Sequence, residues 1–160
     1  MKVGIYAGGN AKIQTLSKDI SGNPFEPNII TRGKRKDGTY FFEIGKAAQK
    51  ELLDIDADEM TFVYNVKKHL CKENWKITFH DGYQSNAIDL SSEVFRWILD
   101  KIQTKKGKKM PEKVVITVPV TYSEMQIARI RKAAEQANVF VDGIISEPVA
   151  AFFSFDECSN

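Results

Sequence analysis

Residues 113–155 decide the fold of this chain and read KVVITVPVTYSEMQIARIRKAAEQANVFVDGIISEPVAAFFSF. The β-branched run at 114–118 is typical of a strand that is buried on both faces. Pro119 ends this strand, because proline has no N–H to donate to a neighbouring strand. The stretch therefore begins with a buried strand whose carboxyl end is marked by a proline.

An amphipathic helix is expected next, over residues 123–137. Ser123 and Gln126 match a capping box, in which each residue satisfies a backbone N–H at the start of the helix. Apolar residues then recur at spacings of three and four and form one stripe, made of Ile127, Ile130, Ala134 and Ala137.

A second strand is expected at 139–145, and Glu147 opens another helix. Strand, helix and strand at this spacing predict a right-handed parallel crossover. Ligands of such units bind beyond the carboxyl ends of the strands, and Pro119 and Glu147 stand at those ends. The sequence thus points to this edge of the sheet as the place for chemistry.

Composition and charge narrow the class of protein. A chain of 160 residues with 42% hydrophobic residues is large enough for one domain with its own core. A net charge of +2 gives no reason to expect nucleic acid as a partner. Two cysteines (Cys71 and Cys158) and two histidines (His69 and His80) offer no metal-binding or disulfide spacing. Without a signal peptide or a membrane-length apolar segment, we expect a cytoplasmic protein with no membrane contact.

The chain before residue 113 is expected to be an α+β region. Strands at 2–7 and 11–16 would form a hairpin around the turn Gly8-Gly9-Asn10. Further elements are expected as a strand at 39–44, a helix at 45–53 with Ala47, Ala48 and Leu52 inward, and strands at 75–79 and 83–88 around Asp81-Gly82. A long helix capped by Ser91 would follow, with an apolar stripe of Val94, Phe95, Ile98, Leu99 and Ile102.

A strand ending in TVP, an amphipathic helix and a second strand ending in EPVAA together resemble the actin-like ATPase superfamily and, within it, the DnaK-type seventy-kilodalton heat-shock chaperones. The resemblance implies an α/β, ribonuclease-H-like lobe with a mixed sheet flanked by helices and an inserted α+β subdomain. The core would be residues 1–35 and 113–160, and the insertion 36–112. Bacterial actin-like filament proteins also have the VP strand and EP helix, but the long stretch from 45 to 111 argues against them.

The resemblance also implies ATP and magnesium as cofactors and suggests nucleotide-binding residues. Gly8, Gly9 and Asn10 occupy the place of the family's first phosphate-binding hairpin, although the same residues also suit an ordinary hairpin turn. Lys67, in the segment YNVKKHL, matches a catalytic lysine that reaches toward the γ-phosphate. Without the resemblance, Lys67 would be interpreted as an exposed helical lysine.

Two further positions match family residues, and two depart from them. Glu147 corresponds to a catalytic acid that acts on water, although it could instead complement the dipole of its helix. Pro119 matches a proline that relays nucleotide state between domains, besides ending its strand. Tyr6 stands where the family has a magnesium-associated aspartate, and Ile127 where it has a signalling arginine. Tyr6 should weaken the hold on magnesium, since a phenol cannot replace a carboxylate there.

Two hypotheses for function follow. In the first, the chain is the N-terminal lobe of a chaperone ATPase that continues beyond Asn160 into a second lobe and a peptide-binding domain, and that works with ATP or ADP, co-chaperones and unfolded clients. In the second, it is a non-enzymatic interaction module of the same fold that binds no cofactor. In either case we expect little activity from the 160 residues alone, because one wall of the nucleotide cleft would be missing.

Overall fold

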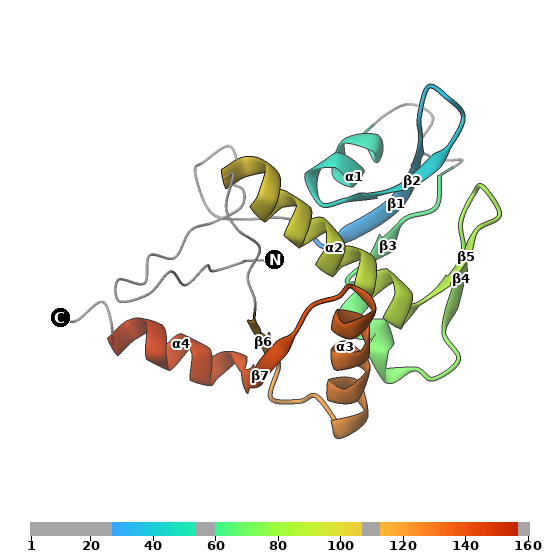
Figure 1. Ribbon diagram of the computed structural model, residues 1–160. Helices are drawn as coiled ribbons and strands as arrows, with labels where there is room; N and C mark the ends of the chain where they lie inside the picture. The colour runs from blue at the N-terminus through green and yellow to red at the C-terminus, as the bar shows by residue number, and fades with distance from the viewer. Residues whose placement is uncertain (1–26, 54–59, 107–112, 157–160) are drawn as a thin grey trace.

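The computed structural model describes residues 27–53, 60–106 and 113–156 (Figure 1). The hairpin expected at 2–16 lies outside these residues. The described elements form a mixed α/β structure with small sheets, whose strand orders are β2-β1-β3, β4-β5 and β6-β7. The α/β class expected from the sequence is confirmed at this level.

The first sheet contains β1 (Ile29–Lys34), β2 (Tyr40–Ile44) and β3 (Val63–Tyr64), with β1 antiparallel to both neighbours. β2 confirms the strand expected at 39–44. Ile30 in the central strand has no exposed surface and packs with Val63 from the neighbouring strand. Burial of these β-branched side chains holds together strands that come from distant parts of the chain.

The short helix α1 (Lys46–Glu51) packs against β1 and β2, but it buries fewer residues than expected. Ala48 is fully buried, whereas Ala47 and Leu52 are exposed, so the inward placement of those two residues is wrong. A helix of six residues makes less than two turns, and residues one position apart point about 100° away from each other. Leu52 lies past the last helical residue.

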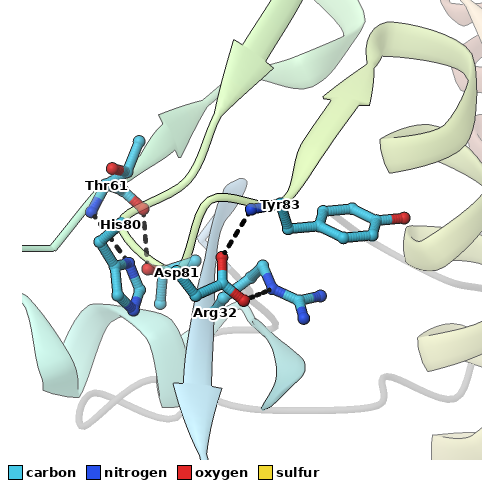
Figure 2. Close-up of polar contacts among 6 residues, drawn as sticks. Arg32, Thr61, His80, Asp81 and Tyr83 are labelled. Atoms are coloured by element: carbon cyan, nitrogen blue, oxygen red, sulfur yellow. Dashed lines mark hydrogen bonds and ion pairs between the residues drawn. The ribbon is translucent and has the colours of Figure 1, made fainter.

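A hairpin of β4 (Lys76–Thr78) and β5 (Gln84–Asn86) follows, and it confirms two strands around the turn at residue 81. Asp81 in that turn joins the hairpin to the first sheet, as Figure 2 shows. Its Oδ2 accepts a hydrogen bond from Arg32 Nε at 2.6 Å, and its Oδ1 accepts one from the Tyr83 amide at 3.2 Å. The turn is therefore fixed to β1 by a side-chain ion pair.

The long helix α2 (Ala87–Lys106) begins four residues before the expected cap. Asn86 Oδ1 accepts hydrogen bonds from the amides of Ile88 and Asp89 at 2.9 and 3.0 Å, which is the role of an N-cap. Ser91 lies inside the helix, and its hydroxyl donates to the Ala87 carbonyl at 2.7 Å. The cap at Ser91 and the strand over residues 87–88 are thus wrong, because Asn86 starts the helix directly after β5.

The last third of the described chain confirms the parallel crossover. It contains β6 (Val114–Val118), α3 (Glu124–Gln136), β7 (Val141–Ser146) and α4 (Glu147–Asp156), and β6 pairs with β7 in parallel. The capping box at Ser123 is confirmed: its hydroxyl accepts from the Gln126 amide, and the Gln126 side chain accepts from the Ser123 amide at 3.0 Å.

The expectation that β6 is buried on both faces is wrong for the part of the chain that the structure describes. Val114, Ile116 and Val118 pack into clusters with α2 and α3 residues, whereas Val115 is 57% exposed. Side chains alternate along a strand, so the clusters take one face of β6 and leave Val115 on the other. β-branched composition alone did not distinguish one buried face from two.

The helix α2 lies between the strands that precede it and the crossover unit that follows it (Figure 1). It contacts β2 and β5 on one side of the sequence and α3 on the other, and it also packs against the 3-10 helix η2 (Val66–Cys71). Leu90 near its start is fully buried with Phe79. None of the described helices is long and apolar enough to cross a membrane.

Candidate functional site

Pro119 and Glu147 lie at the same edge of the β6-β7 pair. Val118 and Ser146 are partners in the parallel register, and each of the two candidate residues is the next residue along its strand. Because parallel strands present their carboxyl ends at one edge, the register places Pro119 and Glu147 at neighbouring strand ends. Glu147 is exposed and is also the first residue of α4, where its carboxylate complements the helix dipole.

Lys67 belongs to η2, whose backbone is fixed at its first turn. Asn65, the residue before this helix, has left-handed dihedral angles (φ 49°, ψ 56°), which asparagine tolerates better than most residues. The Asn65 amide donates to the Asn28 carbonyl at 2.8 Å, and the Lys68 amide donates to the Asn65 carbonyl at 2.8 Å. This turn connects the beginning of β1 to the segment that carries Lys67.

The other end of η2 is anchored in the core. Leu70 has no exposed surface and lies in a cluster with Val118 and Ile130. The Leu70 carbonyl accepts a hydrogen bond from Arg129 Nη1 of α3 at 2.7 Å. The last carbonyls of a helix have no partner within it, so this contact satisfies one of them.

A pocket of about 390 Å³ brings Lys67 and Pro119 together. Its lining includes Asn65, Lys67, Lys68, Pro119, Tyr122 and Gln126, and more of its exposed surface is apolar than polar. Glu147 does not line this pocket, but its carboxylate lies close enough to act on Tyr122, which does. Burial, together with the charge of Glu147, raises the pKa of Tyr122 above its usual value, so the phenol is a hydrogen-bond donor at neutral pH, as tyrosine ordinarily is.

The structure thus brings three of the expected site residues into one neighbourhood: Lys67, Pro119 and Glu147. The others, Gly8, Gly9 and Asn10, lie outside the described residues, as does Tyr6. Their expected position beside a nucleotide remains a prediction.

Sequence reasoning missed Tyr122 and Asn65 as parts of this neighbourhood. Tyr122 Oη donates to the Lys67 carbonyl at 3.2 Å across 55 positions of sequence, a contact that no local pattern indicates. The weak signal at Asn65 was its type, since asparagine directly before a short helical stretch suits a turn with positive φ.

Four residues that line the pocket, Asn65, Lys67, Lys68 and Gln126, have side chains with N–H groups that can donate to phosphate oxygens. Glu147 at the adjacent strand end is a carboxylate that can accept a hydrogen bond from water. In the described ranges, no group of three or more His, Cys, Asp or Glu side chains is placed to hold a metal directly. The chemistry of these lining residues is compatible with a phosphate group.

Comparison with known proteins gives a consistent family. The sequence model of the family described as Hsp70 protein matches residues 34–156. Chaperone protein HscA of Buchnera aphidicola subsp. Baizongia pistaciae (strain Bp) is 31% identical over 110 residues, covering 66% of this chain and 21% of the relative. Heat shock 70-related protein 5 of Dictyostelium discoideum is 30% identical over 126 residues, which cover 72% of this chain and 24% of the relative.

A third relative, the Chaperone protein HscA homolog of Shewanella loihica (strain ATCC BAA-1088 / PV-4), is 30% identical over 107 residues, or 66% of this chain and 17% of its own length. The chain belongs to the Hsp70 family, as its TVP and EPVAA motifs indicated. Its matched part spans a quarter or less of the length of these relatives.

Proposed function

We propose that this chain is the first lobe of the ATPase domain of an Hsp70-type chaperone and that it binds the phosphate end of ATP. Membership of the family implies an actin-like ATPase fold, with which the parallel β6-β7 unit agrees. The proposed core is residues 1–35 and 113–160, with 36–112 inserted. The pairing of β1 with β2 and β3 favours moving the first boundary to before Ile29, which keeps that sheet whole.

One observation carries the proposal: residues expected to act on ATP gather from three separate segments. Lys67 shares a pocket with Pro119, and Pro119 shares a strand edge with Glu147. Chance similarity in the C-terminal motifs would give no reason for a lysine some 50 residues earlier to lie beside them.

Each residue has a role that its chemistry suits. The Lys67 ammonium would neutralise charge on the γ-phosphate, and the Glu147 carboxylate would accept a hydrogen bond from water and orient it. Bound magnesium supplies positive charge at the phosphates. Backbone amides of Gly8, Gly9 and Asn10 would contribute further donors, and Pro119 would transmit the state of the site to a neighbouring domain.

The role of the whole protein extends this proposal. Two of the relatives are named chaperone proteins and one a heat shock 70-related protein. We propose that a longer protein couples ATP hydrolysis to the folding of unfolded clients in the cytoplasm. It would use a second lobe, a peptide-binding domain and co-chaperones.

Titration of the ¹⁵N-labelled chain with ATP and magnesium tests the proposal. We expect chemical-shift changes at residues 65–68, at 119–122 and at Glu147. Lys67→Ala should weaken binding, while Lys132→Ala, which removes the same charge from an exposed site on α3, should not. In the longer protein, Lys67→Ala should lower ATP turnover by roughly 10²-fold, the usual effect of losing one group that stabilises transition-state charge.

Two results would contradict the proposal. One is ATP-induced shifts confined to parts of the chain away from the pocket and the strand edge. The other is equal affinity for ATP in the Lys67→Ala and Lys132→Ala variants.

A further inference from the structure

The loop and helix that follow Pro119 hold η2 by its backbone at two points. Tyr122 Oη donates to the Lys67 carbonyl at 3.2 Å, and Arg129 Nη1 donates to the Leu70 carbonyl at 2.7 Å. Both acceptors belong to a 3-10 helix of six residues, which has few hydrogen bonds of its own. A helix this short depends on tertiary contacts to keep its orientation.

The position of the Tyr122 ring is set by a turn that begins at Pro119. The Tyr122 amide donates to the Pro119 carbonyl at 3.1 Å, closing a four-residue turn. The capping box at Ser123 then starts α3 directly after the turn. The aromatic ring packs against the cluster that contains Leu70 and Val118. The phenol oxygen therefore has a fixed place relative to the end of β6.

We propose that Tyr122 is a positioning residue for Lys67: its hydroxyl fixes the backbone of that lysine relative to Pro119 and to the strand edge that carries Glu147. The inference rests on the proposed function, because it assigns Lys67 a task that requires a defined position. Tyr122 does not itself contact the phosphate in this scheme. It acts by holding the backbone of Lys67, from which the lysine side chain extends, in one position.

The surroundings of the phenol favour a permanent donor. Tyr122 is half-buried, and this burial, together with the carboxylate of Glu147, raises the pKa of Tyr122 and opposes the loss of its proton. A neutral hydroxyl beside a carbonyl that accepts its hydrogen bond is thus the stable state across the neutral pH range. Arg129 contributes differently, since its contact lies at Leu70, three residues beyond Lys67.

The test variant is Tyr122→Phe, which removes one oxygen and keeps the ring in the core. The matched control is Tyr83→Phe, because Tyr83 is a 43% exposed tyrosine whose ring contacts Arg32. In the nucleotide-free chain, amides of residues 66–71 should exchange with solvent about fivefold faster in Tyr122→Phe, as expected for loss of one hydrogen bond. They should be unchanged in Tyr83→Phe.

A second measurement separates positioning from general stability. In the longer protein, Tyr122→Phe should lower kcat for ATP by about fivefold with a smaller change in KM, because a less well placed lysine loses most where negative charge grows toward the transition state. Its thermal midpoint should match that of Tyr83→Phe within about 2 °C, since one partly exposed hydrogen bond contributes little to global stability.

The outcomes are distinguishable. Unchanged exchange at 66–71 in Tyr122→Phe overturns the inference whatever happens to ATP. Faster exchange with unchanged kcat, in a protein whose activity needs Lys67, also overturns it. Activity that does not need Lys67 at all overturns the proposed function instead, and exchange at 66–71 then still decides whether Tyr122 fixes this segment.

Discussion

Arg32 and Asp81 form an ion pair beneath aromatic rings. The guanidinium of Arg32 donates to the Asp81 carboxylate at 2.6 Å, while only 3% of the Asp81 side chain is exposed. The same guanidinium lies 4.3 Å from the Tyr83 ring centroid and 4.9 Å from that of Phe42. Arg32 thus combines one charged hydrogen bond with contacts to two aromatic rings, a combination that lysine, which has no planar guanidinium, would not reproduce.

Removing the charge of Asp81 should destabilise the protein. Asp81→Asn keeps the shape of the side chain but leaves the Arg32 guanidinium without its charged partner, so we expect a loss of about 2 kcal/mol in the free energy of unfolding at pH 7. Urea denaturation measures it. The control Asp142→Asn breaks the exposed pair with Lys113 and should cost less than about 0.5 kcal/mol.

The same pair gives an expected pH dependence. Burial by itself would raise the pKa of Asp81, but hydrogen bonds from Arg32 and from the Tyr83 amide outweigh it and hold the pKa below its usual value. The ionised Asp81 carboxylate therefore contributes its full share to the free energy of unfolding above the ordinary aspartate pKa. This contribution is lost as pH falls through the lowered pKa of the folded state. The stability difference between wild type and Asp81→Asn should shrink in acid, and a constant difference from pH 7 to pH 3 would contradict this account.

His69 should make stability depend on pH in a higher range. Its ring stacks on Trp75 with centroids 4.1 Å apart, and burial, with a smaller effect of Lys72, lowers the pKa of His69 below its usual value. The unfolded chain then takes up a proton first, so stability should fall as pH drops below the ordinary histidine value of about 6.5. His69→Phe keeps a ring on Trp75 and should flatten the stability profile between pH 7 and 5.

The control for this prediction is His80→Gln, at an exposed position on the β4-β5 hairpin. It leaves His69 and Trp75 in place, so the fall in stability should persist. An equal fall in wild type and His69→Phe would show that other groups cause it.

The cap of α2 offers a fourth prediction. Asn86→Ala removes the acceptor for two helix amides and should cost about 1 kcal/mol, whereas Asn86→Ser should retain most of the stability. Ser92→Ala should be neutral or stabilising, because that hydroxyl is buried and has no hydrogen-bond partner in the described structure. Thermal melts followed by circular dichroism measure all three, and a larger loss for Ser92→Ala than for Asn86→Ala would refute this account of the helix start.

A fifth prediction concerns the affinity of the 160-residue chain for ATP. One lobe would supply one wall of the proposed nucleotide cleft, and Tyr6 replaces a carboxylate expected near magnesium. We therefore expect a dissociation constant in the high micromolar range or weaker, about −5 kcal/mol. Isothermal calorimetry with and without magnesium measures it. Sub-micromolar, magnesium-dependent binding would contradict the expectation.

The elements that sequence predicted well are those specified by neighbouring residues. The capping box at Ser123, the β-branched run of β6 and the helix after Glu147 each lie within a few residues of the signal that indicates them. The start of α2 was wrong because residues 83–88 were assigned to a strand, whereas the strand ends at Asn86 and the side chain of Asn86 caps the helix.

The candidate site also contains residues that the local sequence indicates and residues that only tertiary packing brings together. Pro119 and Glu147 could be placed at one edge because a parallel crossover brings its carboxyl ends together. Lys67 was indicated by family resemblance alone, since nothing local distinguishes it from Lys68. Tyr122 was missed because its contact with the Lys67 carbonyl depends on how η2 packs against the turn after β6.

A register shift near the start of the β6-β7 pair determines where the chain can accept an insertion or a deletion. Val114 pairs with Val141 and Val115 with Gly143, so Asp142 is an extra residue at the start of the pair, and the register is regular from there to Val118 and Ser146. Deleting Asp142 would remove that bulge and leave the later pairing intact. A deletion between Gly143 and Ser146 would instead shift Glu147 by about 3.3 Å along the strand and reverse the face on which it stands relative to Pro119. Insertions and deletions are therefore compatible with this site at the amino end of the strand pair and not at its carboxyl end.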